Sequence, residues 1–213
     1  MRLHCFGESG NAYKAALTLQ LAGFDWQPVW VDFFAGATRS AAFRALNPMG
    51  ELPVLEDGER VLTQSAVIQL HIARKAGRFL GADQREQDEV LRWLFWDNHK
   101  LTANASSVRF LSNFLPEAKR PGPVIAFQTA RLRDALKVLN THLEGRDWIV
   151  GDGPTIADFA ACGYLYYPEP FGFARADWPQ IDSWLARIAA LPGWKPPYEL
   201  MPGSPADRAE KSS

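Results

Sequence analysis

The sequence has few cysteines, no long apolar run and no excess of charge of either sign. Cys5 and Cys162 are the two cysteines among 213 residues, and no CxxC pair is present, so we expect neither a disulfide framework nor a zinc knuckle. No apolar run approaches the roughly 18 residues of a membrane helix. The opening residues, MRLHCFGESGN, lack the apolar stretch of a signal peptide. We therefore expect a cytoplasmic protein with no membrane partner.

Charge and motif searches exclude several further classes of function. The 23 basic and 24 acidic residues give a formal net charge of −1, whereas a nucleic-acid binder normally shows a basic excess or stripe. The four histidines have no ligand spacing such as HExxH, so we expect no metal. A GxGxxG or Walker loop is also absent. The segment GESGN has Asn11 where the GxSxG motif of a serine hydrolase requires glycine.

The remaining composition is that of an ordinary globular protein, with 47% hydrophobic residues and enough length for one large or two small domains. The N-terminal third predicts the order β-α-β-α-β-β-α. Its elements follow from alternating apolar residues, from helical spacing and from the Asp57-Gly58 hairpin turn. Gly23 stands where a C-terminal glycine belongs. The expected strands are 2–6, 26–31 and the hairpin 53–62, and the expected helices are 12–22, 39–46 and 65–76.

After Gly77 the patterns are helical throughout. We expect domains at 1–77 and 86–195 and a poorly ordered tail at 196–213, where proline, serine and charge accumulate. Thr155 and Asp158 have the spacing of a capping box, which predicts the start of a buried helix. The aromatic stretches 93–96 and 110–114 are assigned to the core, with a minority of their rings lining a pocket or a dimer contact.

This order of elements, with Leu52-Pro53 opening the third strand and Gln64-Ser65 starting the last helix of the unit, resembles the glutathione transferases. The resemblance covers roughly residues 1–195. It implies an α/β thioredoxin-like N-terminal domain followed by an all-α helical C-terminal domain. The segment Ser9-Gly-Asn11-Ala-Tyr-Lys is similar to the bacterial serine/asparagine type, which is theta-like or nu-like.

The resemblance implies that glutathione is the co-substrate and that a small electrophile is the second substrate. Free thiols titrate near 8.5, and a hydroxyl that donates to the sulfur favours the thiolate. Ser9 and Asn11 occupy the place of that donor, just after the first strand. Both residues are also favoured helix N-caps, and the two roles are compatible.

The resemblance also implies a set of glutathione-binding residues. Leu52 would pair its backbone with the cysteinyl part, and the Leu52-Pro53 bond would be cis. Ser65 would offer its hydroxyl and amide to the γ-glutamyl carboxylate, because helix starts bind anions. Gln64, where many relatives carry an acid, would hydrogen-bond the γ-glutamyl amine.

Three positions complete this expectation. Glu51 would repel the glycyl carboxylate unless it is turned away, and Arg39 would supply positive charge there. Asp97 would reach the partner's glutathione across a homodimer interface.

Three functions remain open at this point. The first is a homodimeric glutathione transferase that conjugates glutathione to apolar electrophiles, which is a detoxification chemistry. The second is a glutathione-dependent disulfide reductase, favoured by the similarity around Ser9. The third is a non-catalytic binding module with the same fold, favoured by Glu51 and by the neutral Gln64.

Overall fold

A computed structural model describes residues 1–203 of the chain, and residues 204–213 lie outside the described part. Internal contacts divide the described chain into two compact units. One unit contains residues 1–78 and 192–203, and the other contains residues 79–191. No helix in residues 1–203 has the length and apolarity needed to cross a membrane.

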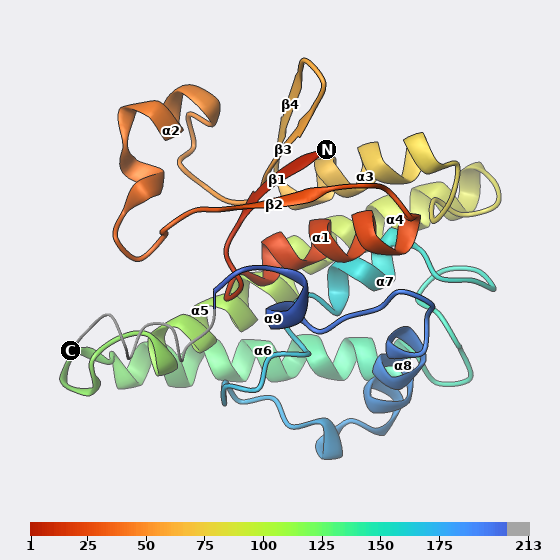
Figure 1. Cartoon of the computed structure of the whole chain (residues 1–213). Coiled ribbons are helices and arrows are strands. Elements are labelled where there is room, and N and C mark those ends of the chain that lie inside the picture. The colour runs from red at the N-terminus through yellow and green to blue at the C-terminus, as the bar shows by residue number, and fades with distance from the viewer. Residues whose placement is uncertain (204–213) are drawn as a thin grey trace. The chain divides into compact units, whose positions relative to one another are not determined.

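The first unit is built on a four-stranded sheet in the order β2-β1-β3-β4 (Figure 1). β1 and β2 are parallel, while β3 is antiparallel to both β1 and β4. The order of elements is the predicted one. The strands are β1 (Arg2–Cys5), β2 (Gln27–Trp30), β3 (Val54–Asp57) and β4 (Arg60–Thr63), and the helices are α1 (Gly10–Ala22), η1 (Ala37–Arg39), α2 (Ala41–Leu46) and α3 (Ser65–Ala76).

Successive side chains along β1 and β3 point to opposite faces of this sheet. Leu3 pairs with Leu55 and both are fully buried, whereas the neighbouring pair His4 and Val54 points to the opposite face. Val54 packs with Phe43 of α2. α1 and α3 lie side by side (Figure 1). Gly23 closes α1 in the left-handed conformation, at φ 76°, as expected for a C-terminal glycine.

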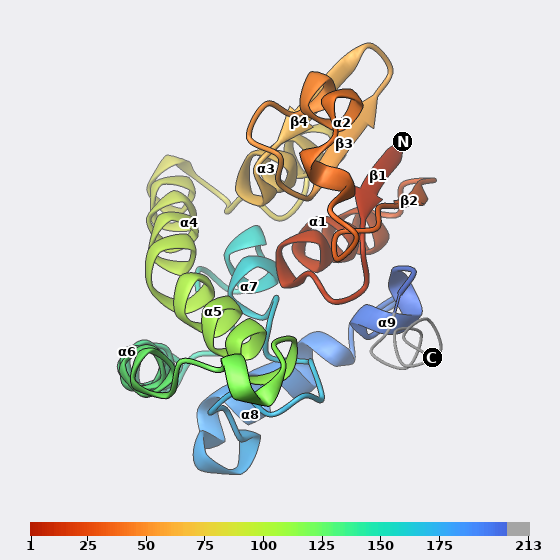
Figure 2. The same cartoon turned by 90° about the vertical axis from the view of Figure 1, so that its left-hand side faces the viewer.

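Helices are the regular secondary structure of the second unit, and no strand is present in residues 79–191. Figure 2 views α6 nearly end-on, with α4 leading into α5 through a π-helical turn. The elements are α4 (Gln84–Trp96), η2 (Asp97–Leu101), α5 (Thr102–Asn113), η3 (Glu117–Lys119), α6 (Gly122–His142), α7 (Ile156–Ala161), η4 (Arg175–Asp177) and α8 (Pro179–Ala189).

The predicted capping box at the start of α7 is confirmed. The Thr155 amide donates to Asp158 Oδ2 at 2.8 Å, and the Thr155 hydroxyl oxygen accepts from the Ala157 amide at 3.2 Å. The same carboxylate also accepts hydrogen bonds from the Ile149 amide and from Trp184 Nε1, each at 2.9 Å. Asp158 therefore joins α7, α8 and the segment before α7.

The structure differs from the sequence expectation in two places. Residues 196–203 were expected to be poorly ordered, but α9 (Pro197–Leu200) is a helical turn, and Leu200 and Met201 are 8% and 3% exposed. Burial of these apolar side chains in the first unit outweighs the local excess of proline. Within the aromatic stretch 93–96, Trp93 is buried but Phe95 is 74% exposed, so this stretch is only partly core.

Candidate functional site

The candidate residues gather at one edge of the sheet of the first unit. β1 and β4 both run towards this edge, because each is antiparallel to β3, and the chain leaves each strand to enter a helix. Ser9 precedes α1 and Gln64 precedes α3. The carboxyl ends of these strands therefore bring two helix N-termini to the same edge.

Ser9 is the N-cap of α1, and it is 8% exposed. Its Oγ accepts a hydrogen bond from the Ala12 amide at 3.1 Å, and its own amide donates to the Phe6 carbonyl at 3.1 Å. A serine oxygen accepts through a lone pair and still carries one O–H donor. The capping role thus leaves the hydroxyl hydrogen available for a ligand at this edge.

Asn11 and Ser65 link the two helix starts. The Ser65 hydroxyl donates to Asn11 Oδ1 at 3.5 Å, although the residues are 54 positions apart. The first turns of α1 and α3 contain no acidic residue. The positive ends of these helices favour anions such as a thiolate or a carboxylate.

Gln64 and Glu51 form a second link at this edge. Gln64 has a positive φ of 67° and starts α3. Its Nε2 donates to Glu51 Oε2 at 2.9 Å, and the Glu51 carbonyl accepts from Asn47 Nδ2 at 2.8 Å. The Glu51 carboxylate is therefore directed at Gln64. The next peptide bond, Leu52-Pro53, is cis, as the resemblance implied.

Two of the candidate residues, Arg39 and Asp97, take no part in the hydrogen bonds described above. Arg39 is exposed at the end of η1, with its guanidinium against Gly36. Asp97 belongs to the second unit, where it is 2% exposed and accepts a hydrogen bond from the Thr102 hydroxyl at 2.9 Å. The other candidates lie at the starts of α1 and α3 or in the loop before β3. They are Ser9, Asn11, Gln64, Ser65 and the Leu52-Pro53 bond.

Cys5 lies in β1 but is not a second thiol centre. Burial raises the pKa of its thiol to about 12, so the group is un-ionised at neutral pH and is a poor nucleophile. Within residues 1–203, no group of three or more histidine, cysteine, aspartate or glutamate side chains is arranged to hold a metal.

Gly7 is a residue that the sequence analysis did not single out, yet its amide donates to the Pro202 carbonyl at 2.6 Å. An ideal Cβ on Gly7 would clash with the Gly203 carbonyl oxygen. The turn cluster Gly7-Glu-Ser-Gly10 was the available signal, but it does not reveal which segment approaches the glycine.

Comparison with known proteins agrees with this architecture. The family model for the glutathione S-transferase N-terminal domain matches residues 1–74, and the model for the C-terminal domain matches residues 104–192. Glutathione S-transferase 3 of Zea mays is 30% identical, with 96% of each chain covered. The disulfide-bond oxidoreductase YfcG of Escherichia coli K12 is 28% identical over 88% of this chain and 89% of its own.

Solved structures give the same result. A crystal structure of a glutathione S-transferase from Xanthobacter autotrophicus Py2 superposes with a TM-score of 0.86 at 35% identity, covering 98% of both chains. Similarity of this extent spans both units of the described chain. The chain therefore belongs to the glutathione S-transferase family.

Proposed function

We propose that this protein is a glutathione transferase of the serine/asparagine type, in which Ser9 stabilises the thiolate of bound glutathione. The observation that carries the proposal is the meeting of two helix N-termini, with Ser9 at one, Ser65 at the other and Asn11 between them. Membership in the family supports glutathione as the co-substrate.

The chemistry requires one hydrogen bond to sulfur. Ser9 Oγ donates to the sulfur, with Asn11 assisting, and the thiol proton leaves to solvent. A hydrogen bond to a charged group contributes about 1.5–3 kcal/mol, which corresponds to a thiol pKa about one to two units lower. The thiolate then attacks an apolar electrophile, a carbon–sulfur bond forms, and the leaving group departs with the electron pair of its own bond.

The tripeptide is held along the same edge. The γ-glutamyl carboxylate replaces Asn11 Oδ1 as the acceptor of the Ser65 hydroxyl and also accepts from the amides of the first turn of α3. Gln64 binds the γ-glutamyl amine. The backbone of Leu52, before Pro53, pairs with the cysteinyl part.

The proposed glutathione site includes two further residues, Arg39 and Asp97, and a second copy of the chain. Arg39 supplies positive charge for the glycyl carboxylate. The protein is a homodimer, as the resemblance to the family implies. Asp97 acts on the partner's glutathione. An unchanged glutathione affinity in Asp97→Ala would remove that role.

A second candidate is glutathione-dependent disulfide reduction, which the relative named as a disulfide-bond oxidoreductase favours. There the thiolate attacks a sulfur of a small disulfide and releases the other sulfur as a thiol. Product analysis separates the two reactions, because the transferase yields a thioether and the reductase yields a glutathione disulfide.

The test compares Ser9→Ala, Ser9→Thr and Ser40→Ala with an aryl halide as electrophile. Ser40 is the matched control, because it also caps a helix, accepting from the Phe43 amide at 3.2 Å, but lies at the start of α2. We expect Ser9→Ala to lower kcat/KM at neutral pH by about tenfold or more, given the lost hydrogen bond to sulfur. Ser9→Thr retains most activity because threonine also supplies a hydroxyl.

Equal losses of turnover and of glutathione affinity in Ser9→Ala would contradict the assigned role. A comparable loss in Ser40→Ala would attribute the effect to helix capping. If the wild-type protein fails to hold glutathione, the binding-module function takes its place.

A further inference from the structure

We propose that residues 195–202, here called the C-terminal strap, position Ser9 for thiolate stabilisation by holding the chain on both sides of it. This inference rests on the proposed function and adds a positioning element to the same site. The strap and Ser9 both belong to the first unit. Figure 1 shows α9, the helical part of the strap, next to the start of α1.

The first attachment lies immediately before Ser9. The Gly7 amide donates to the Pro202 carbonyl at 2.6 Å, while the Ser9 amide donates to the Phe6 carbonyl within the turn. One amide of the 6–9 turn is thus held by the turn itself and another by the strap. The path of the backbone into Ser9 therefore depends on a segment almost 200 residues away.

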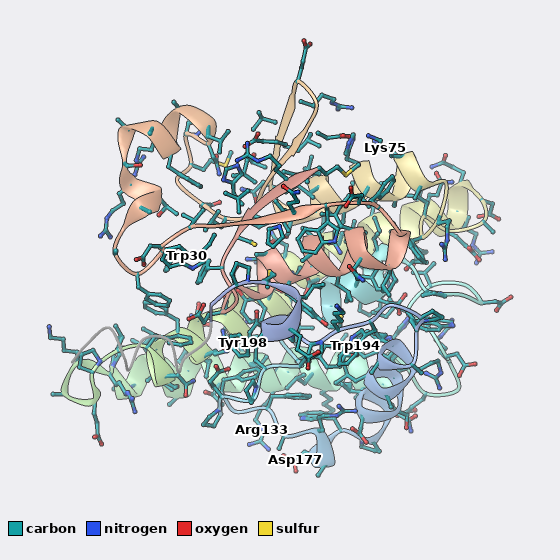
Figure 3. All side chains as sticks on the ribbon, viewed as in Figure 1. Trp30, Lys75, Arg133, Asp177, Trp194 and Tyr198 are labelled. Carbon is teal, nitrogen blue, oxygen red and sulfur yellow. The ribbon has the colours of Figure 1, made fainter. Side chains whose placement is uncertain are left out.

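Two facing glycines make this close approach sterically feasible. A Cβ on Gly7 would clash with the Gly203 carbonyl oxygen and would lie 3.0 Å from Cδ1 of Tyr198. Gly203 has φ +102°, and a Cβ there would lie 3.0 Å from Glu8 Oε2. Only glycine combines this φ with backbone contact at such range. Figure 3 labels Tyr198 on the strap.

The second attachment lies one helical turn after Ser9. The Tyr13 hydroxyl donates to the Lys195 carbonyl at 2.9 Å, and the Tyr13 amide donates to the Ser9 carbonyl at 2.9 Å. Tyr13 is fully buried, and Leu200 and Met201 of the strap are buried as well. The strap is therefore bound at both ends, and Ser9 lies between its two points of contact.

Thiolate stabilisation is sensitive to such placement. A displacement of about 1 Å in a positioned group can cost about 100-fold in rate. If the strap separates from Gly7, the 6–9 turn loses the hydrogen bond from the Gly7 amide to the Pro202 carbonyl, and Ser9 Oγ is no longer held towards the sulfur. Release of the strap would then raise the thiol pKa of bound glutathione.

The experiment compares Gly7→Ala with the control Gly122→Ala. Gly122 also lies near a helix start, but nothing lies within 4 Å of a Cβ there. Neither glycine has a left-handed φ, so the variants differ in the clash and not in backbone strain. Hydrogen–deuterium exchange measures how fast the backbone amides of residues 6–12 and 196–202 exchange with solvent. The ultraviolet absorbance of the thiolate, recorded as a function of pH, measures the thiol pKa of bound glutathione.

We expect Gly7→Ala to speed exchange in both segments and to raise the thiol pKa by about one unit, a tenfold loss of thiolate at a pH below both pKa values. Gly122→Ala should match the wild type. Tyr13→Phe, which deletes the hydroxyl bond to Lys195 without adding bulk, should change both readouts in the same direction by less. This second variant decides the question if Gly7→Ala does not fold.

Faster exchange in the strap with an unchanged thiol pKa would overturn the proposal. Unchanged exchange in both variants would overturn it as well, because the attachments would then not hold the strap. If wild-type protein binds no glutathione, the proposed function fails separately. In that case the claim that the strap holds the chain around Ser9 is tested by amide exchange in residues 6–12. An unchanged exchange rate there in Gly7→Ala would refute it.

Discussion

The Ser65 hydroxyl donates to Asn11 Oδ1 at 3.5 Å, and this contact joins the N-terminal turns of α1 and α3. Ser65 is 8% exposed and lies at the first position of α3. A hydroxyl and the amides of a helix start thus face the same edge as the Ser9 cap. Under the proposed function, α3 binds the γ-glutamyl carboxylate while α1 acts on the thiolate.

Replacing Ser65 by alanine should weaken glutathione binding. The lost hydroxyl removes a hydrogen bond to a charged carboxylate, so we expect the dissociation constant to rise at least about tenfold. Calorimetric titration of glutathione at neutral pH measures it. Ser107→Ala is the control, because Ser107 is partly exposed in α5 and its hydroxyl donates to the Ala103 carbonyl. Equal affinities of Ser65→Ala and wild type would show that the tripeptide does not use α3.

Glu51→Gln should strengthen glutathione binding. The Glu51 carboxylate lies beside the site and accepts from Gln64, and a glutamine there keeps the acceptor oxygen while removing the negative charge. At an exposed position we expect a gain of up to about fivefold in affinity, shrinking as salt is added. Glu59→Gln, exposed in the hairpin turn, serves as the control. A weaker affinity in Glu51→Gln would mean that the carboxylate itself helps to hold glutathione or Gln64.

Asp158→Ala should destabilise the second unit by about 3–5 kcal/mol. Burial raises the pKa of the Asp158 carboxyl, and hydrogen bonds from Ile149, Thr155 and Trp184 oppose that shift. Removing the carboxylate leaves these buried donors unsatisfied, each at a cost of about 1–3 kcal/mol before relaxation. Denaturant unfolding measures the loss. Asp158→Asn, which keeps one acceptor oxygen, should lose less, and equal losses in the two variants would contradict this account.

His142 should make stability depend on pH. Burial lowers the pKa of its imidazole below the ordinary 6.5, while Nε2 lies 2.8 Å from the Ile149 carbonyl. Because the unfolded chain then binds the proton more readily, the stabilisation is complete above about pH 6.5 and is lost as the pH falls towards the folded-state pKa. The free energy of unfolding from pH 8 to 5 tests this.

The matched variants for that measurement are His142→Gln and His99→Gln. His142→Gln should flatten the fall in stability between pH 6.5 and 5. His99 is exposed in the π-helical turn, and its replacement should leave the fall in place. If the free energy of unfolding of His142→Gln falls with pH as steeply as that of the wild type, other groups cause the pH dependence.

The sequence by itself determined the local elements of this protein and its family. Gly23 closes α1, Gly58 opens the two-residue hairpin turn between the paired residues Asp57 and Arg60, and Thr155 with Asp158 caps α7, because each signal is satisfied by residues a few positions away. Ser9, Asn11 and Ser65 were recognisable for the same reason, since each follows a strand and starts a helix. The resemblance then supplied their expected roles.

Only the tertiary structure decided how distant segments meet. Arg109 is buried against Glu169, 60 residues later, with Nη2 and Oε2 2.8 Å apart, and no periodic pattern predicts such a pair. The Gly7–Pro202 contact is similar, and it attaches residues 196–203, the described part of the tail that was expected to be poorly ordered. Helix and turn signals depend on neighbours along the chain, whereas these contacts depend on burial that appears only when the chain has folded.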